Sequence, residues 1–257
     1  MKAGKRPAAS KLAEQADFTN TLQIREPRGA PAPLRSTQVI LLASIPLLRE
    51  SAPADDFTWQ AIGVCERVLA LLLLVLVMPV LIVSAAAIAV LSGRTPLIAH
   101  RRVGWHGSTL WMLKLRTMWN GAPGRRGWIE RIEDDLGPAR KQAADVRVSS
   151  ALARFCRKHS IDEVPQLWHV VRGEMSLIGP RPLTLREIRE HYGDTASEML
   201  RLKPGIAGLW QISGRNRLTY DERRRMDLEF VRARSFRMYL RIALRTLPEI
   251  VSGANTW

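Results

Sequence analysis

The chain has 257 residues, of which 46% are hydrophobic, and it carries 39 Lys and Arg against 24 Asp and Glu. This apolar content excludes a wholly disordered chain, and two cysteines give no sign of a disulfide framework or a thiolate metal site. The net charge of +15 and the pI near 11.0 indicate a polyanionic neighbour: nucleic acid, an anionic membrane surface or a phosphorylated substrate.

Residues 1–58 are rich in Ala, Pro and mixed charge, which predicts a flexible N-terminal extension. An apolar patch at residues 39–48 is interrupted by Pro46 and is too short to span a bilayer. The patch is therefore either a second interfacial anchor or a partner-binding helix.

Residues 68–92 contain no charged side chain, and the run is longer than the roughly 20 residues that a spanning helix needs. It begins too far from Met1 for an ordinary signal peptide. The remaining alternative is a buried helix of a soluble protein. We predict a membrane helix over residues 59–93.

Pro79 lies near the middle of this run and favours a kink, because proline removes one helical hydrogen bond. Each half would be about 18–20 Å long, against a hydrocarbon core of about 30 Å. Both flanks are basic, with Arg49 and Arg67 before the run and Arg94 and Arg101 after it. The positive-inside rule then favours a re-entrant helix, broken at Pro79, that returns to the same face, over a helix that crosses.

Residues 109–118 predict a strand in which Met112, Lys114 and Arg116 share one face. The two cations then project side by side, either as phosphate contacts or as the solvated side of an edge strand. Residues 120–143 are rich in Gly, Pro and charge, which predicts a mobile surface loop of the kind that often covers a site.

A helix is predicted over residues 149–159, with Leu152, Phe155 and Cys156 on one side and Arg157 on the polar side. Asp162 and Glu163 follow. Because Pro165 is tolerated in the first turn of a helix, it places both carboxylates at or just before a second N-terminus. They are either an N-cap and a first-turn acid, or a nucleophile and a ligand for a hard cation such as Mg²⁺.

Residues 179–182 read Gly-Pro-Arg-Pro, in which two prolines hold the guanidinium of Arg181 at low entropic cost, as suits phosphate recognition. Residues 203–215 contain glycines that permit close backbone approach to a ligand, and they end at Arg215. Trp210, within them, is more typical of core than of a base-stacking residue. None of these glycines forms a Walker or dinucleotide fingerprint, so the sequence predicts no redox nucleotide.

Thr219 and Glu222 form a capping-box pattern for a helix running to about Arg234. A second helix is predicted from Ser235, with an apolar face and an arginine stripe, and such amphipathic basic helices lie in anionic membrane interfaces. The alternative is an arginine-laced helix packed on the domain. The apolar residues are Phe236, Tyr239, Leu240, Ala243 and Leu247, and the arginines are 237, 241 and 245.

Residues 160–183, which read Ser-Ile-Asp-Glu-Val-Pro-Gln-Leu-Trp-His-Val-Val-Arg-Gly-Glu-Met-Ser-Leu-Ile-Gly-Pro-Arg-Pro-Leu, resemble the signature of bacterial sugar transferases, the monotopic phosphoglycosyl transferases. Residues 101–104, 114–118, 145–147 and 203–215 resemble further blocks of that family. The resemblance covers about residues 60–250 and is closest to the small, minimal members. It implies an α+β, mostly helical monotopic membrane enzyme with a re-entrant helix, a small β element and amphipathic interfacial helices.

The resemblance further implies that Asp162 attacks the β-phosphorus of a UDP-sugar, releases UMP and passes the sugar phosphate to polyprenyl phosphate. Glu163, with Asp162, would hold Mg²⁺. Residues 94–257 would be the catalytic domain, on the cytoplasmic face of the bacterial inner membrane. Downstream glycosyltransferases would be its partners. Implied phosphate contacts are Arg102, Lys114, Arg116, Arg157, Arg181 and Arg215.

This chain departs from the family pattern at Met78, where Ser is frequent, at His169, and at Tyr239, where Asp is frequent. A duty that the family assigns to that Asp cannot be carried by Tyr239, although Asp227 is available. The departures leave an inactive scaffold open as one alternative, and the basic composition leaves a second, a membrane-tethered protein that binds nucleic acid or lipid. The acid pair argues against both, because a binder of polyanions gains nothing from carboxylates within its basic surface, so we expect no nucleic-acid partner.

Overall fold

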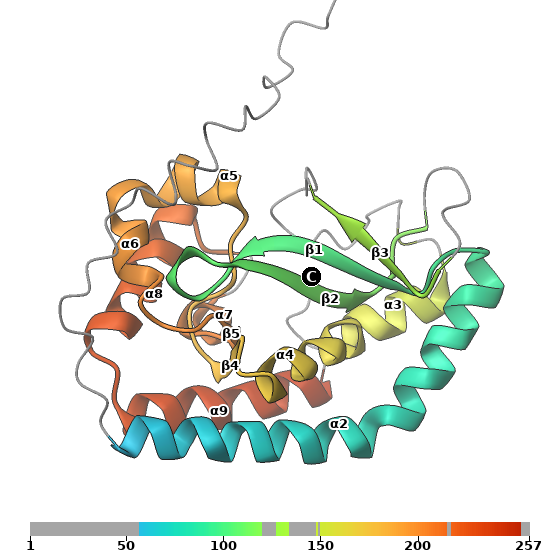
Figure 1. Ribbon diagram of the computed structural model, residues 1–257, viewed down its shortest axis with the longest axis horizontal. Coiled ribbons are helices and arrows are strands. Elements are labelled where there is room, and N and C mark those ends of the chain that lie inside the picture. The colour runs from blue at the N-terminus through green and yellow to red at the C-terminus, as the bar shows by residue number, and fades with distance from the viewer. Residues whose placement is uncertain (1–56, 120–126, 134–147, 149, 215–216, 253–257) are drawn as a thin grey trace, which may run out of the picture. The chain divides into compact units, whose positions relative to one another are not determined.

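A computed structural model of the chain describes residues 57–119, 127–133, 148, 150–214 and 217–252, all within one unit. The N-terminal extension, most of the predicted 120–143 loop, residues 145–147 and Arg215 lie outside the described residues. The fold is α+β, as predicted, with short strands between many helices (Figure 1). In chain order the elements are α2 (Phe57–Ser92), β1 (Leu97–Val103), η1 (Trp105–Gly107), β2 (Thr109–Leu115), β3 (Ile129–Ile132), α3 (Ala151–Lys158), η2 (Ile161–Gln166), α4 (Leu167–Val171), β4 (Ser176–Ile178), α5 (Leu185–Glu187), η3 (Ile188–Tyr192), η4 (Gly193–Thr195), α6 (Ala196–Met199), β5 (Gly205–Ala207), α7 (Leu209–Ser213), α8 (Tyr220–Arg232) and α9 (Phe236–Ser252).

The larger sheet has the order β2-β1-β3, with β1 antiparallel to β2 and parallel to β3. The predicted strand 109–118 is three residues too long at its end. The last pair of the β1–β2 ladder is Leu97 with Leu115, and β1 begins there because Pro96 has no amide to donate. Arg116 therefore falls outside the strand, and it does not share a strand face with Lys114.

Helix α2 is 36 residues long and has Pro79 inside it, so the helix does not end at the predicted break. Figure 1 shows instead a continuous helix that changes direction partway along its length. Its most apolar window has a mean hydropathy of 3.1, and only 17% of that window is buried. A core helix of a soluble protein would be largely covered, whereas the described residues leave side chains such as Leu76 exposed.

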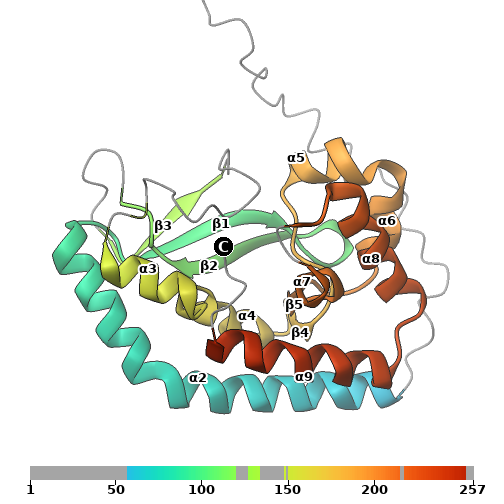
Figure 2. The same ribbon diagram turned by 180° about the vertical axis from the view of Figure 1, so that it is seen from behind.

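The first half of α2 packs against the rest of the protein along one stripe. Ala70 contributes to a core cluster with Leu110 and Met112 of β2 and with Val170 of α4. Figures 1 and 2 both show α9 lying beside this half of α2, while the second half turns towards α3. The apolar helix is thus part of the folded unit, and its other faces are exposed.

Helix α3 shows one error in the predicted faces. Ser150 caps it by accepting from the amide of Ala153, and the buried residues are Ala153, Cys156 and Arg157. Phe155 was predicted to face inward, but it is exposed. The inward stripe is rotated because α3 packs against η2, which turns the Arg157 side towards the interior.

Helices α8 and α9 begin as predicted, α8 with a complete capping box between Thr219 and Glu222. On α9 the predicted apolar face divides, since Tyr239 and Ala243 are half-buried while Phe236 and Leu240 are exposed. Ile242, which was not assigned to that face, is buried. The helix therefore packs on the domain through one stripe and also presents Phe and Leu next to arginines, the composition of an interfacial helix. The exposed residues are Phe236, Arg237, Leu240, Arg241, Leu244 and Arg245.

Candidate active site

The acid pair lies in η2, a 3-10 turn that leads directly into α4. Ser160 adopts a left-handed conformation (φ 55°), and its carbonyl accepts from the amide of Glu163 at 3.0 Å. Asp162 and Glu163 therefore occupy the first turn, as predicted, whereas Pro165 comes one turn later than predicted, as the fifth residue of η2. The sharp bend places the two carboxylates in different environments.

Asp162 is buried, with 3% of its surface exposed, at the place where η2 contacts both α3 and α2. Its charge is felt by Cys156 on α3: burial raises the pKa of that thiol, and Asp162 raises it further. The same thiol is hydrogen-bonded to the side chain of Ser84, a buried polar residue in the second half of α2. The apolar helix thus meets the rest of the protein next to Asp162.

Glu163 accepts from the Nζ of Lys114 in β2 at 3.0 Å, and both side chains are largely buried. Such a pair is held more firmly than a surface ion pair, because solvent screens it less. The alternative that Lys114 is a solvated residue of an edge strand is therefore wrong. The structure brings this predicted cation to the acid pair by direct contact.

Arg116 goes elsewhere. Its Nε donates to the carbonyl of Thr95 at 2.7 Å, and its Nη2 lies 2.6 Å from Oε2 of Glu130 in β3. Arg157 is 5% exposed on α3, five residues before Asp162. Arg102 is also buried, and its neighbour Val103 donates its amide to Leu183, which places the end of β1 beside the Gly-Pro-Arg-Pro turn.

The Gly-Pro-Arg-Pro turn follows β4, which pairs in parallel with β5. Gly179 donates to Ala207, and Gly205 donates to Pro180. A Cβ on Gly205 would lie 2.0 Å from the nitrogen of Gly179, so these glycines serve backbone-to-backbone approach. The prediction that Gly205 allows a ligand to approach is therefore wrong, because the space beside it is filled by the backbone of Gly179. This packing holds the turn rigidly.

Arg181 sits above Trp210, with its guanidinium carbon 5.8 Å from the ring centroid, and Arg223 of α8 lies 4.6 Å from the same ring. Trp210 is 6% exposed, which confirms that it is a core residue. Fully buried Asp227 accepts from the hydroxyl of Tyr192 at 2.8 Å. Burial raises the pKa of Asp227 to about 7, although Tyr192, Arg181 and Arg223 all act to lower it.

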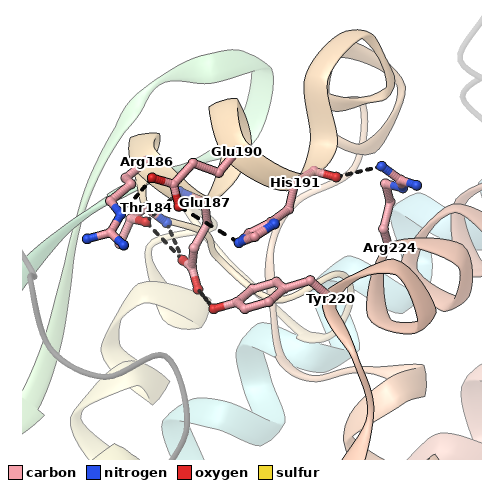
Figure 3. A network of polar contacts seen from close by, with 7 residues as sticks. All are labelled: Thr184, Arg186, Glu187, Glu190, His191, Tyr220 and Arg224. Carbon is pink, nitrogen blue, oxygen red and sulfur yellow. Dashed lines mark hydrogen bonds and ion pairs between the residues drawn. The ribbon is translucent and has the colours of Figure 1, made fainter.

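A polar network fixes this cluster from the side (Figure 3). Glu187 accepts from the amide and hydroxyl of Thr184 and from the hydroxyl of Tyr220. The Tyr220 ring stacks on His191, with centroids 3.8 Å apart, and Arg224 donates to the His191 carbonyl. Helix α8 is thereby tied to α5 and η3, which keeps Tyr192 next to Asp227.

Sequence reasoning did not assign Arg223 or Tyr192 to the site, and it noted Asp227 only as available. A signal did exist for two of them. Arg223 and Asp227 are four residues apart on a helix with a clear capping box, so they share a face. Tyr192 lies in a π-helical turn, η3, that no local pattern announces.

His169, one of the departures from the family pattern, has a structural role. Its Nε2 accepts from the amide of Leu113 in β2 at 3.2 Å, so the ring proton lies on Nδ1, 2.6 Å from Glu174. The residue therefore joins α4 to β2. Nothing about this substitution points to a lost active site.

The described residues contain no group of three or more His, Cys, Asp or Glu that could enclose a metal ion. Mg²⁺ is commonly held by one or two carboxylates together with waters and substrate phosphates. Asp162 and Glu163 supply two carboxylates from one turn, the donor type that such an ion uses. The arrangement as a whole is a buried carboxylate, a second carboxylate paired with lysine, and buried Arg157 on the adjoining helix α3, which suits chemistry on a phosphorylated substrate.

Comparison with known proteins agrees with this chemistry. The profile of the family described as Bacterial sugar transferase matches residues 59–253. The chain is 35% identical over 205 residues to the exopolysaccharide production protein ExoY of Sinorhizobium fredii, covering 76% of this chain and 89% of that protein. It is 33% identical to the UDP-glucose:undecaprenyl-phosphate glucose-1-phosphate transferase of Caulobacter vibrioides, covering 80% and 76%. It is 39% identical to the undecaprenyl-phosphate galactose phosphotransferase of Salmonella typhimurium, covering 54% and 30%.

Proposed function

The chain belongs to the bacterial sugar transferase family and is a transferase, and on that premise we propose that it moves a sugar 1-phosphate from a UDP-sugar to a polyprenyl phosphate such as undecaprenyl phosphate. The reaction releases UMP and begins exopolysaccharide synthesis, the process named for the Sinorhizobium relative. The observation that carries the proposal is the position of Asp162 and Glu163, in the turn that contacts the apolar helix α2.

The proposed chemistry has two displacements. An oxygen of the Asp162 carboxylate attacks the β-phosphorus of the UDP-sugar, the bond from that phosphorus to the bridging oxygen breaks, and UMP leaves with the electron pair. A phosphate oxygen of the lipid then attacks the same phosphorus and restores the carboxylate. An ionised aspartate is a competent nucleophile for this purpose, and microenvironments that hold carboxylates near cations favour the ionised form.

The other groups hold charge in place. Lys114 neutralises the charge of Glu163, so that Glu163 and Asp162 have different roles. Glu163 with Asp162 would hold Mg²⁺, which would neutralise charge on the diphosphate. Arg102, Arg157, Arg181 and Arg215 are proposed to contact phosphate oxygens. Arg116 would first have to release Glu130.

The two substrates differ in solubility, and the surfaces of the protein suit that difference. We propose that α2 enters the bilayer and returns to the same side, and that α9 lies in the headgroup layer with its exposed Leu and Arg side chains. The chain would then work at the cytoplasmic face of the inner membrane, where a water-soluble UDP-sugar and a membrane lipid can meet at Asp162. Its product would pass to downstream glycosyltransferases.

Asp162→Asn tests the proposal, with purified protein in nanodiscs, a panel of UDP-sugars, polyprenyl phosphate and Mg²⁺. The variant should release no UMP and should form no adduct, whereas the wild type should show a phosphosugar on Asp162 by mass spectrometry. Glu198→Gln, which breaks an exposed ion pair with Arg232, is the matched control and should turn over normally. UMP release that persists in Asp162→Asn refutes the nucleophile, and DNA binding without turnover of any UDP-sugar refutes the transferase.

A further inference from the structure

The residue that ties the membrane helix to the rest of the fold is Glu66, which lies two positions before the apolar run. It is a buried carboxylate, with 8% of its surface exposed. Its Oε1 accepts from the Ser176 hydroxyl at 2.6 Å, the Leu177 amide at 2.8 Å and the Tyr239 hydroxyl at 2.7 Å. One side chain therefore joins α2, β4 and α9.

Strand β4 needs this acceptor. Among the described strands it has a partner on one side only, β5, and on that side the amide of Ser176 donates to the carbonyl of Pro204, which directly precedes β5. The amide of Leu177 points to the opposite edge, where Glu66 takes the place of a strand. A buried amide without a partner is unfavourable, so this contact holds the open edge of β4 against the start of α2.

The position of β4 is passed on to Arg181. Only Gly179 and Pro180 separate the end of β4 from that arginine, and Gly179 is packed against the backbone of Gly205 without room for a Cβ. A shift of β4 therefore cannot be absorbed within the turn. Positive charge also faces Glu66, because its carboxylate interacts with Arg234 and Lys203.

We propose that Glu66 is a positioning residue for sugar phosphate transfer, because it fixes the Arg181 turn relative to the start of the membrane helix. The proposal rests on the proposed function, in which Arg181 contacts a phosphate. Tyr239 shares this positioning role, because its hydroxyl donates a hydrogen bond to Glu66. Tyr239, where the family frequently has Asp, therefore has a role of its own.

The alternative is that Glu66 only stabilises the fold, and a double-mutant cycle separates the two. Glu66→Ala and Tyr239→Phe are made in the wild-type chain and in Arg181→Lys, which keeps the charge but loses the planar fork. kcat and KM for both substrates and the thermal midpoint are measured in nanodiscs. Glu66→Gln is the conservative control, because its carbonyl can still accept from the Leu177 amide.

Glu66→Ala should lower kcat/KM by about 100-fold, as misplaced catalytic groups do. Glu66→Gln should restore activity to within about threefold of wild type. In Arg181→Lys, the further loss caused by Glu66→Ala should fall below about threefold, because the two residues act through one contact. Equal losses in both backgrounds, or no loss at all, overturn the proposal while leaving the transferase intact.

If Glu66→Ala does not fold, Tyr239→Phe decides by the same criterion. A loss of kcat/KM in the wild-type background that shrinks in Arg181→Lys supports the proposal, and a loss that is the same in both contradicts it. No UMP from the wild-type chain would instead remove the proposed function together with this role of Glu66. The two failures are therefore distinguishable.

Discussion

Replacing Asp227 by Asn should change how the stability of the protein depends on pH. Burial raises the pKa of Asp227 from 3.8 to about 7, against the lowering effects of Tyr192, Arg181 and Arg223. Between those two values the folded protein keeps this proton and the unfolded chain has lost it. The free energy of unfolding therefore falls as pH rises through this window, and the loss is complete above about pH 7.

The size of the effect follows from the same two values. Raising a carboxyl pKa from 3.8 to about 7 corresponds to at most about 4 kcal/mol. For a chain of this size that is at most about 16 °C in the thermal midpoint. Asparagine keeps an acceptor for the Tyr192 hydroxyl and does not titrate, so its variant should lack this component.

The assay is thermal unfolding in nanodiscs at pH 5, 6, 7 and 8 for the wild type, Asp227→Asn and a control. Asp194→Asn is a suitable control because Asp194 is exposed in η4. Other titrating groups cancel when each variant is compared with wild type at the same pH. The wild type should lose stability relative to Asp227→Asn as pH rises from 5 to 8. Parallel curves for the two proteins would refute the argument that Asp227 is protonated in the fold.

Two further substitutions test the packing. Gly205→Ala should destabilise the protein by about 3 kcal/mol, because its Cβ would meet the backbone of Gly179. Gly63→Ala in α2 is the control: its Cβ meets nothing within 4 Å, and the variant should be neutral or slightly stabilised. Chemical denaturation of both variants measures the difference. Tyr239→Asp restores the residue frequent in the family, yet it places a second carboxylate beside buried Glu66 and should lower stability by about 3 kcal/mol, against about 1 kcal/mol for Tyr239→Phe. A Tyr239→Asp protein as stable as wild type in thermal unfolding would contradict the Glu66 contact.

Much of the candidate site was predictable because its signals are local. Pro165 restricts the backbone near Asp162 and Glu163, and the structure places both acids in the first turn of η2. The capping box at Thr219 and Glu222 likewise predicted the start of α8. Such patterns involve residues within one or two turns of each other, so their geometry does not depend on the rest of the fold.

Charge pairing was not predictable in the same way. Lys114 and Arg116 look equivalent in sequence, but one binds Glu163, 49 positions away, and the other binds Glu130. Their roles diverge because the β1–β2 ladder ends at Leu115, which depends on where β1 begins. The faces of α3 and α9 were misjudged for a related reason, since the neighbours that a helix packs against decide which stripe is buried.

By itself, the amino-acid sequence determined the apolar helix, the acid pair before Pro165, the rigid Arg181 turn and, through their combination, the family. These are properties of short segments, where covalent geometry and apolar length act directly. Only the tertiary structure decided that Glu66 completes the edge of β4 and meets Tyr239, 173 positions later in the chain. A buried carboxylate takes whichever donors the packed elements bring to it, and that choice is made by the whole fold.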